Sequence, residues 1–313
     1  MELLAIIHRH MDQRIQKDIA DKISQKMGVV FVEFKNLPQG MGSLVFLAQD
    51  EKGREYAIKM GQDVGADVRV LELITQSGIE IPVSRILGCF DLPQGKTLVM
   101  ERINKPLLEE LTGKEMSEFI VPMLDCLKAL HGIKSSRAGM VGKTDSPEDW
   151  KAFLLFKYSG KHPWFNWRQI ALRDGVDSNL IAKSVALMAK KISSAELPKE
   201  DYSLLHTDFN QRNIFVDPLH HRIAGIIDWS EATFGDPLYD FARVRMLIWH
   251  FGLGKDVEET YFRYLGLSVE EKVREEVYLQ SQILDYISWY SQEKDDFNVG
   301  RLKLHQDFLR QGF

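Results

Sequence analysis

A single stretch of the chain, residues 204–217 (LLHTDFNQRNIFVD), gathers polar side chains that could do chemistry. It places His206, Asp208 and Asn213 around the start of an apolar run, and a second acid, Asp228, ends the later apolar segment IAGIID. A hairpin through the turn PLHHR would bring Asn213 and Asp228 together. An amide oxygen and a carboxylate suit Mg²⁺, which prefers oxygen ligands. Asp208 would then be placed to accept a proton from an attacking hydroxyl group.

The overall composition fits an ordinary globular protein. With 313 residues, 44% of them hydrophobic, the chain can bury one large core or the cores of two lobes. The formal net charge of −5 supplies no general attraction to nucleic acid or to anionic membranes, whereas a cationic small molecule is compatible with it. Only Cys89 and Cys126 occur, and their spacing suits neither a disulfide framework nor a structural zinc site.

The sequence also shows no signal for export or membrane insertion. Its start, MELLAIIHRH, has a short apolar run without the basic lead-in of a signal peptide. No window approaches the roughly 20 apolar residues of a membrane span. We therefore expect a cytoplasmic protein with no membrane or nucleic-acid partner.

The hydrophobic pattern predicts an α+β fold. Residues 1–27 have helical periodicity, which indicates a leading helix pair, and residues 63–77 return to a helical period with Asp67 on the apolar face. Extended runs separated by turn residues lie at 29–34, 43–50, 55–60, 78–90 and 96–103. These runs predict a five-stranded antiparallel sheet with one helix after the third strand. The rest of the chain is mostly helical, apart from short strands at 213–217 and 223–228.

The loop around Asp208 has a counterpart in a known family. The residues His206-Thr207-Asp208 with Asn213, followed by Asp228, resemble the catalytic loop and the metal-binding aspartate of the aminoglycoside phosphotransferase family. Members of this family are protein-kinase-like kinases of small molecules. The run IIDWSEATFGDPLYDFA resembles the same family, and the resemblance extends from about Val29 to Arg245.

This resemblance implies a protein-kinase-like fold of two lobes. Residues 1–103 would form the N-terminal nucleotide-binding lobe, with the leading helices at its start and the hinge at its end. Residues 104–313 would form the larger, mainly helical lobe for catalysis and substrate binding. The implied residues here are Asp208 as catalytic base, Asn213 and Asp228 as metal ligands, and His206 and Asp240 as structural supports of the loop.

The first hundred residues also match the family pattern. Lys59 ends the third predicted strand and would reach the α- and β-phosphates, with Asp67 in place of the usual pairing glutamate. Since aspartate is shorter, this ion pair would need a closer helix or a bridging water. The glycines of QGMGS would let the backbone approach an anion, and LVMERI resembles the interlobe hinge, with its backbone facing adenine. The implied nucleotide-binding residues are Gly40, Gly42, Ser43, Lys59, Asp67, Met100, Glu101 and Ile103.

The implied activity is Mg²⁺-dependent transfer of the γ-phosphate of ATP or GTP to a hydroxyl group of a small molecule. An aminoglycoside such as hygromycin B is the first expectation for the acceptor. A kinase of a macrolide or of a small metabolite would share the same motifs. A nucleotide-binding pseudokinase is the alternative from another class, although competent residues fill the base and metal positions. Protein substrates are disfavoured because only a short link follows Asp228.

Each of these residues also has an ordinary structural explanation. Acids and amides in a loop, taken singly, usually form turns, and a lysine at the end of a strand usually lies at the surface. Gly40 and Gly42 would equally suit a simple hairpin turn. Five acids could form a pocket for a polycation or belong to a solvated face, namely Glu231, Asp285, Glu293, Asp295 and Asp296.

Overall fold

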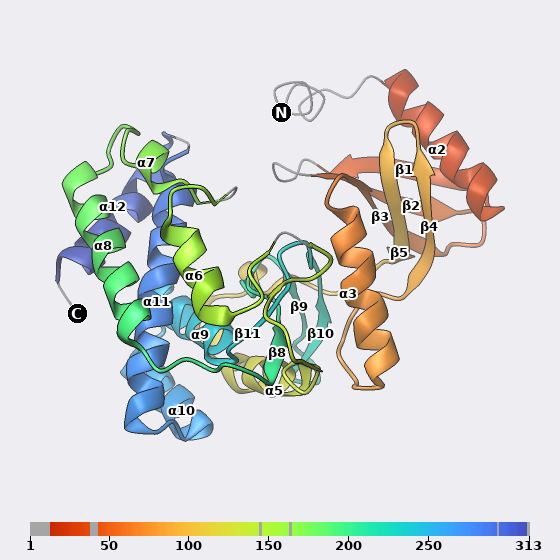
Figure 1. The fold of residues 1–313 in the computed structure, drawn as a ribbon. Coiled ribbons are helices and arrows are strands. Elements are labelled where there is room, and N and C mark those ends of the chain that lie inside the picture. The colour runs from red at the N-terminus through yellow and green to blue at the C-terminus, as the bar shows by residue number, and fades with distance from the viewer. Residues whose placement is uncertain (1–12, 38–42, 144–145, 163–164, 293, 312–313) are drawn as a thin grey trace. The chain divides into compact units, whose positions relative to one another are not determined.

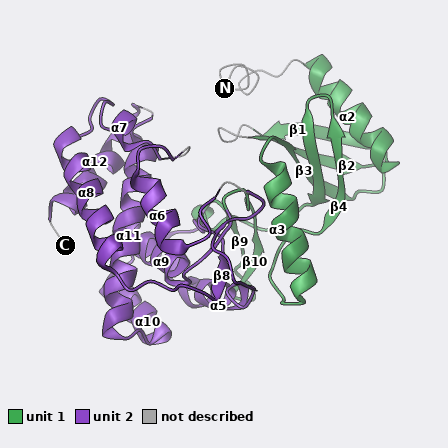
Figure 2. Cartoon of the chain, viewed as in Figure 1, with its two compact units in different colours: residues 1–110, 212–231 green, residues 111–211, 232–313 purple. Residues whose placement is uncertain are grey.

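The structure is a computed structural model that describes residues 13–37, 43–143, 146–162, 165–292 and 294–311 (Figure 1). The chain divides into two compact units (Figure 2). Unit 1 contains residues 1–110 and 212–231, and unit 2 contains residues 111–211 and 232–313. The chain thus returns to unit 1 for a second segment, while the lobe boundary expected at residue 103 stays a prediction.

An antiparallel sheet forms the centre of unit 1. Its strands are β1 (Phe31–Leu37), β2 (Ser43–Asp50), β3 (Glu55–Gly61), β4 (Ile86–Leu92) and β5 (Gly95–Glu101), in the order β1-β2-β3-β5-β4. The predicted five-stranded sheet is therefore confirmed. One run is shorter than predicted, because β4 begins at Ile86 and not at residue 78. Earlier in that run, Val83 forms a parallel bridge to Ile226, and the Pro82 carbonyl accepts a hydrogen bond from Ile226 N at 2.8 Å.

Two helices cover opposite faces of this sheet: α2 (Gln13–Met27) and α3 (Val64–Ser77). Because side chains alternate along a strand, Ile58 and Lys59 of β3 point to opposite faces. Ile58 belongs to a buried cluster that includes Ile23 of α2. Lys59 points toward α3, whose buried face contains Asp67 among apolar residues, as the helical period predicts. This alternation is what brings Lys59 and Asp67 together.

A hairpin from the second segment completes unit 1. Strands β9 (Ile214–Asp217) and β10 (Arg222–Ile226) pair antiparallel, with Ile214 opposite Ile226. The pairing continues one residue further, since Ile227 N donates to the Asn213 carbonyl at 3.0 Å. A short 3-10 helix, η1 (Leu108–Glu110), contacts β9. The predicted hairpin is confirmed, and its open end carries Asn213 and Asp228.

Unit 2 is mainly helical. Its helices are α4 (Gly113–Ser117), α5 (Ile120–Leu130), α6 (Trp150–Tyr158), α7 (Trp167–Ile170), α8 (Ser178–Ser194), α9 (Leu238–His250), α10 (Lys255–Leu265), α11 (Val269–Tyr290) and α12 (Asp296–Arg310). A small sheet in the order β6-β8-β11-β7 consists of β6 (Lys134–Ser135), β8 (Tyr202–Leu205), β11 (Thr233–Gly235) and β7 (Gly139–Met140). Helix α11 packs against α8, α9 and α12. Over the described part of the chain, no helix combines the length and apolar character that crossing a membrane requires.

Candidate active site

The side chain of Lys59 lies between two carboxylates within unit 1. Its Nζ atom is 2.9 Å from Asp67 Oδ2 and 2.8 Å from Asp228 Oδ1, and the side chain is only 13% exposed. Burial opposes the charge of Lys59, but the two carboxylates outweigh this effect and raise its pKa. The interpretation of Lys59 as a surface lysine is therefore wrong, and the shorter acid Asp67 reaches it without a bridging water.

Asp67 also holds the backbone that follows Asp228. Its Oδ1 atom accepts a hydrogen bond from Trp229 N at 2.8 Å, and the indole of Trp229 is buried and donates to the Ile226 carbonyl at 3.3 Å. One buried carboxylate therefore fixes both Lys59 and the turn that carries Asp228. The sequence did not predict this role of Trp229, because it depends on how α3 packs on the turn.

Asp228 occupies a turn with an unusual backbone. Its φ of 65° lies in the left-handed region, which residues with side chains rarely adopt and which is frequent at functional sites. Its side chain remains 45% exposed, and Oδ1 also accepts a hydrogen bond from Ser230 Oγ at 3.1 Å. Because Asp67 is only 4% exposed, Asp228 is the carboxylate of the pair that solvent and ligands reach more easily.

The donor set at the open end of the hairpin fits a hard divalent cation. Asn213 directly precedes β9 and Asp228 follows β10, so both lie at the same end of the hairpin, where they offer an amide oxygen and a carboxylate. Mg²⁺ commonly takes one or two carboxylates from a protein and completes its shell with phosphate and water. Among the residues that the structure describes, no group of three or more His, Cys, Asp or Glu side chains could hold a metal. A cation here would therefore depend on its nucleotide and water for further ligands.

The remaining nucleotide-binding predictions concern residues 40–43 and 100–103. Gly40 and Gly42 lie outside the described residues, and Ser43 begins β2 opposite Gly61. Met100 and Glu101 end β5. The N–H of Glu101 donates to the Arg85 carbonyl at 3.0 Å, so in the predicted contact with adenine the backbone of Glu101 could only accept a hydrogen bond, through its carbonyl oxygen. The side chain of Ile103 packs on Gly225 of β10.

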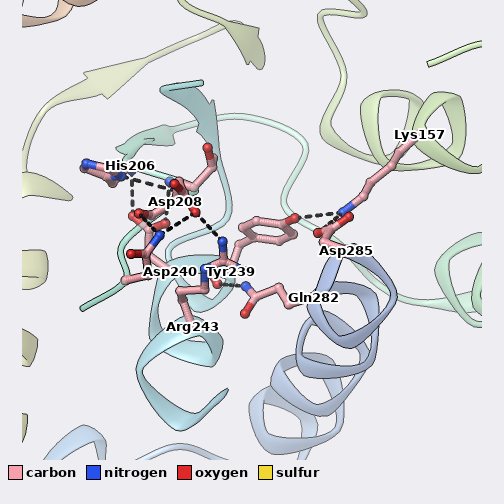
Figure 3. A network of polar contacts seen from close by, with 10 residues as sticks. Lys157, His206, Asp208, Tyr239, Asp240, Arg243, Gln282 and Asp285 are labelled. Atoms are coloured by element: carbon pink, nitrogen blue, oxygen red, sulfur yellow. Dashed lines mark hydrogen bonds and ion pairs between the residues drawn. The ribbon is translucent and has the colours of Figure 1, made fainter. Parts of the chain in front are cut away.

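Asp208 lies in unit 2, in the loop after β8. Its Oδ1 atom accepts hydrogen bonds from Asn210 Nδ2 at 2.8 Å and from Arg243 Nη2, and its side chain is 32% exposed (Figure 3). The preceding residue, Thr207, has a φ of 64°. A partly exposed carboxylate held by two donors on a strained loop is well suited to orient a hydroxyl group.

Asp240 at the start of α9 fixes the backbone of this loop. Its carboxylate accepts hydrogen bonds from His206 N at 2.8 Å and from Thr207 N at 2.9 Å, and it lies 3.2 Å from His131 Nε2. The imidazole of His206 is buried, and its Nδ1 atom accepts a hydrogen bond from Asp208 N at 3.3 Å. These contacts are consistent with a supporting role for His206 and Asp240.

Sequence reasoning missed Arg243. It follows Asp240 by three residues on α9, so the two side chains share one helix face. Its guanidinium group is 4.9 Å from the ring centroid of Tyr286, which adds a cation–π contact to the ion pair with Asp208. The signal that could have found it is the three-residue spacing in YDFAR, once a helix is assigned there.

A second buried cation lies near the same helices. Lys157 Nζ is 2.6 Å from Asp285 Oδ2 and 3.1 Å from the Tyr239 hydroxyl, and Figure 3 shows this group together with Arg243. Asp285, one of the five acids considered for a cationic ligand, is therefore already paired with Lys157. Asp295, another of the five, accepts a hydrogen bond from Asn298 N as the N-cap of α12. Glu293 lies outside the described residues, Asp296 is exposed, and Glu231 belongs to unit 1.

Comparison with known proteins defines the class. Residues 33–276 match the phosphotransferase enzyme family APH, and this match covers most of the chain. The protein therefore belongs to this phosphotransferase family.

Individual relatives are distant. The hygromycin-B 4-O-kinase of Escherichia coli is 23% identical over 171 residues, which cover 52% of this chain and 47% of that protein. The chain thus spans about half the length of that relative. The uncharacterised protein YcbJ of Bacillus subtilis (strain 168) is 23% identical over 260 residues, which cover 76% of this chain and 77% of YcbJ.

Solved structures share the fold. The apo form of a thermostable mutant of aminoglycoside phosphotransferase APH(4)-Ia has a TM-score of 0.71 and 19% identity, covering 94% of this chain and 99% of that one. A ternary complex of that enzyme with AMP-PNP and hygromycin B has a TM-score of 0.70 and 20% identity, with 94% and 97% covered. A putative fructosamine-3-kinase from Thermobifida fusca YX-ER1 has a TM-score of 0.61 and 16% identity, with 93% and 97% covered. The protein-kinase-like fold is thereby confirmed.

Proposed function

We propose that this protein is a Mg²⁺-dependent kinase that transfers the γ-phosphate of ATP or GTP to a hydroxyl group of a small molecule. The observation that carries the proposal is the position of Lys59, which is buried between Asp67 and Asp228. A lysine fixed in this way can bind phosphate oxygens as a point charge, and Asp67 keeps it in place if Asp228 turns toward a metal. In this proposal residues 1–103 bind the nucleotide, and residues 104–313 provide the base and the acceptor site.

The nucleotide would be bound mainly by backbone groups and Lys59. We assign the phosphate loop to Gly40, Gly42 and Ser43, whose N–H groups and hydroxyl can donate to phosphate oxygens. We assign adenine to the hinge, with Met100 as an apolar wall and the backbone of Glu101 and Ile103 as hydrogen-bonding partners. Support comes from the related APH(4)-Ia, which has been solved with AMP-PNP.

Asn213 and Asp228 would hold Mg²⁺. The cation, when bound, neutralises charge on the β- and γ-phosphates during transfer. What the chain itself contributes is a pair of oxygen donors preorganised by the β9–β10 hairpin, and a carboxylate whose turn is fixed through Trp229 and Asp67.

Asp208 would act as the catalytic base. It would accept a hydrogen bond from the acceptor hydroxyl, orient its oxygen toward the γ-phosphorus and take the proton as the new P–O bond forms and the bond to the ADP oxygen breaks. The backbone contacts from Asp240 to His206 and Thr207 keep the loop in place for this step. Transfer is direct, so no phosphorylated enzyme forms.

We propose an aminoglycoside, with hygromycin B as the first candidate, for the acceptor. Support comes from the similarity to a hygromycin-B 4-O-kinase and from the likeness to APH(4)-Ia, which has been solved with hygromycin B. A macrolide or a small metabolite remains the alternative within the same chemistry, and the fold likeness to a putative fructosamine-3-kinase supports including sugar-amine metabolites in any test.

The direct test is a coupled assay of ADP or GDP release with Mg²⁺ across hygromycin B, other aminoglycosides, macrolides and hydroxylated metabolites. The Asp208→Asn variant serves as the blank, because it keeps the size of the side chain and a hydrogen bond acceptor but removes the base. We expect acceptor-stimulated turnover by the wild type and a loss of roughly 10²–10⁴-fold in the variant. Tight nucleotide binding without turnover on any acceptor would favour the pseudokinase alternative.

A further inference from the structure

Helix α9 contacts three consecutive residues of the Asp208 loop. Asp240 accepts hydrogen bonds from the backbone of His206 and Thr207, and Arg243, one turn later, donates to the side chain of Asp208. Asp240 is fully buried, and the Arg243 side chain is 10% exposed. One rigid element therefore fixes both the path of the loop and the carboxylate of the proposed base (Figure 3).

The contact from Arg243 restrains the carboxylate itself. Arg243 and Asn210 both donate to the same atom, Asp208 Oδ1, so rotation of the carboxylate group would break two hydrogen bonds at once. Arg243 is in turn restrained by burial and by the ring of Tyr286 at 4.9 Å. Burial disfavours its charge, but Tyr286, Asp208 and Asp285 outweigh this effect and raise the pKa of the guanidinium group.

A cation on a catalytic base has a chemical cost, because it weakens the base. In phosphoryl transfer this cost is small, since the transition state is loose and catalysis depends mostly on positioning and charge neutralisation. An arginine is therefore useful here if the main task of Asp208 is to orient the hydroxyl group.

We infer that Arg243 is a positioning residue for phosphoryl transfer, which holds the carboxylate of Asp208 in the orientation that receives the acceptor hydroxyl. The inference rests on the proposed role of Asp208 as the base. It adds a residue that acts through Asp208 and makes no contact of its own with the substrate.

A double-mutant cycle tests this role. The variants are Arg243→Met, Asp208→Asn and the double variant, and the measured quantities are kcat and the KM for ATP with Mg²⁺ and hygromycin B. A residue that acts only through Asp208 has no further effect once Asp208 is changed. We expect Arg243→Met to lower kcat by up to about 100-fold with the KM for ATP unchanged, and the double variant to be no slower than Asp208→Asn.

Two further variants separate positioning from folding. Arg243→Lys keeps the charge but not the fork of donors, and it should retain more of kcat than Arg243→Met. If thermal unfolding shows that Arg243→Met does not fold, Arg243→Lys replaces it in the double-mutant cycle. Arg301→Met is the matched control, since Arg301 of α12 donates to the carbonyl of His250 at the C-terminal end of α9, away from the turn with Asp240 and Arg243. Its effect should be additive with Asp208→Asn.

The outcomes are distinct. If the wild type turns over and Arg243→Met slows the Asp208→Asn background as much as it slows the wild type, Arg243 is structural and the inference fails while the proposed function stands. If the wild type transfers no phosphate to hygromycin B or any other acceptor of the panel, the proposed function fails and the inference fails with it. The inference is supported if the effects of Arg243→Met and Asp208→Asn on kcat are not additive and Arg243→Lys retains more of kcat than Arg243→Met.

Discussion

At the scale of single residues, Lys59 and Asp208 are each held by a partner of opposite charge. The two partners differ in how well the sequence predicts them. Asp67 could be predicted as the partner of Lys59, because a helical period is local and places it on the face that packs on the sheet. For Arg243 the helical spacing indicates only that it shares a face with Asp240, whereas its contact with Asp208, 35 residues away, depends on the packing of α9. Lys157 and Asp285, 128 residues apart, are equally hidden.

Asp228 provides a prediction at this scale. Asp228→Ala removes the more exposed carboxylate beside Lys59, and we expect it to weaken Mg²⁺-dependent nucleotide binding by about tenfold or more. Isothermal calorimetry with AMP-PNP, with and without Mg²⁺, measures this. Asp91→Ala is the control, because Asp91 lies in the same unit, is 81% exposed and pairs only at 3.7 Å with Lys96. Equal Mg²⁺ dependence in the two variants would remove Asp228 from the metal site.

At the scale of elements, the hairpin β9–β10 follows from its sequence, whereas its attachment does not. Two apolar runs around the turn PLHHR predict the pairing, and the observed register agrees. The contacts of β10 with residues near Pro82 and Ile103 come from distant segments, which explains why residues 78–85 were wrongly predicted as strand. Local patterns therefore gave the elements, and tertiary contacts decided where some of them end.

Gly225 provides the prediction for this scale. A Cβ atom at Gly225 would overlap the side chain of Ile103, which we assign to the adenine-binding hinge. Gly225→Ala should destabilise the protein by about 1–3 kcal/mol through overpacking and weaken nucleotide binding as well. Urea unfolding and nucleotide titration measure the two effects. The double variant Gly225→Ala/Ile103→Val makes room for the methyl group, and failure of this variant to recover any stability would contradict the explanation.

At the scale of the whole molecule, the described chain buries several titratable groups whose charge must be accommodated on folding. His305 of α12 is fully buried among aromatic rings, and its Nδ1 atom lies 2.7 Å from the Arg301 carbonyl. Burial lowers its pKa to about 4. In the unfolded chain a histidine has a pKa of about 6.5. Such a group favours the folded state when it is neutral.

This difference predicts an acid-sensitive stability. Because the folded-state pKa is the lower one, the contribution of His305 is complete above about pH 6.5 and is lost as the pH falls toward about 4. We expect the free energy of unfolding to fall by about 2 kcal/mol from this residue between roughly pH 7 and pH 5. Urea unfolding at both pH values, compared with His305→Gln, checks this, since glutamine can still donate to the Arg301 carbonyl. An identical pH dependence in the variant would exclude His305 as its source.

The central claim is direct transfer of a phosphoryl group from a nucleotide to a small-molecule hydroxyl group. The most direct measurement follows a radiolabelled γ-phosphate of ATP, with Mg²⁺ and the best acceptor of the panel, in the wild type and in Asp208→Asn. We predict that the label appears on the acceptor with the wild type, at a greatly reduced rate with the variant, and never on the protein. Label that collects on the protein chain, or that reaches the acceptor equally fast with Asp208→Asn, would contradict the account.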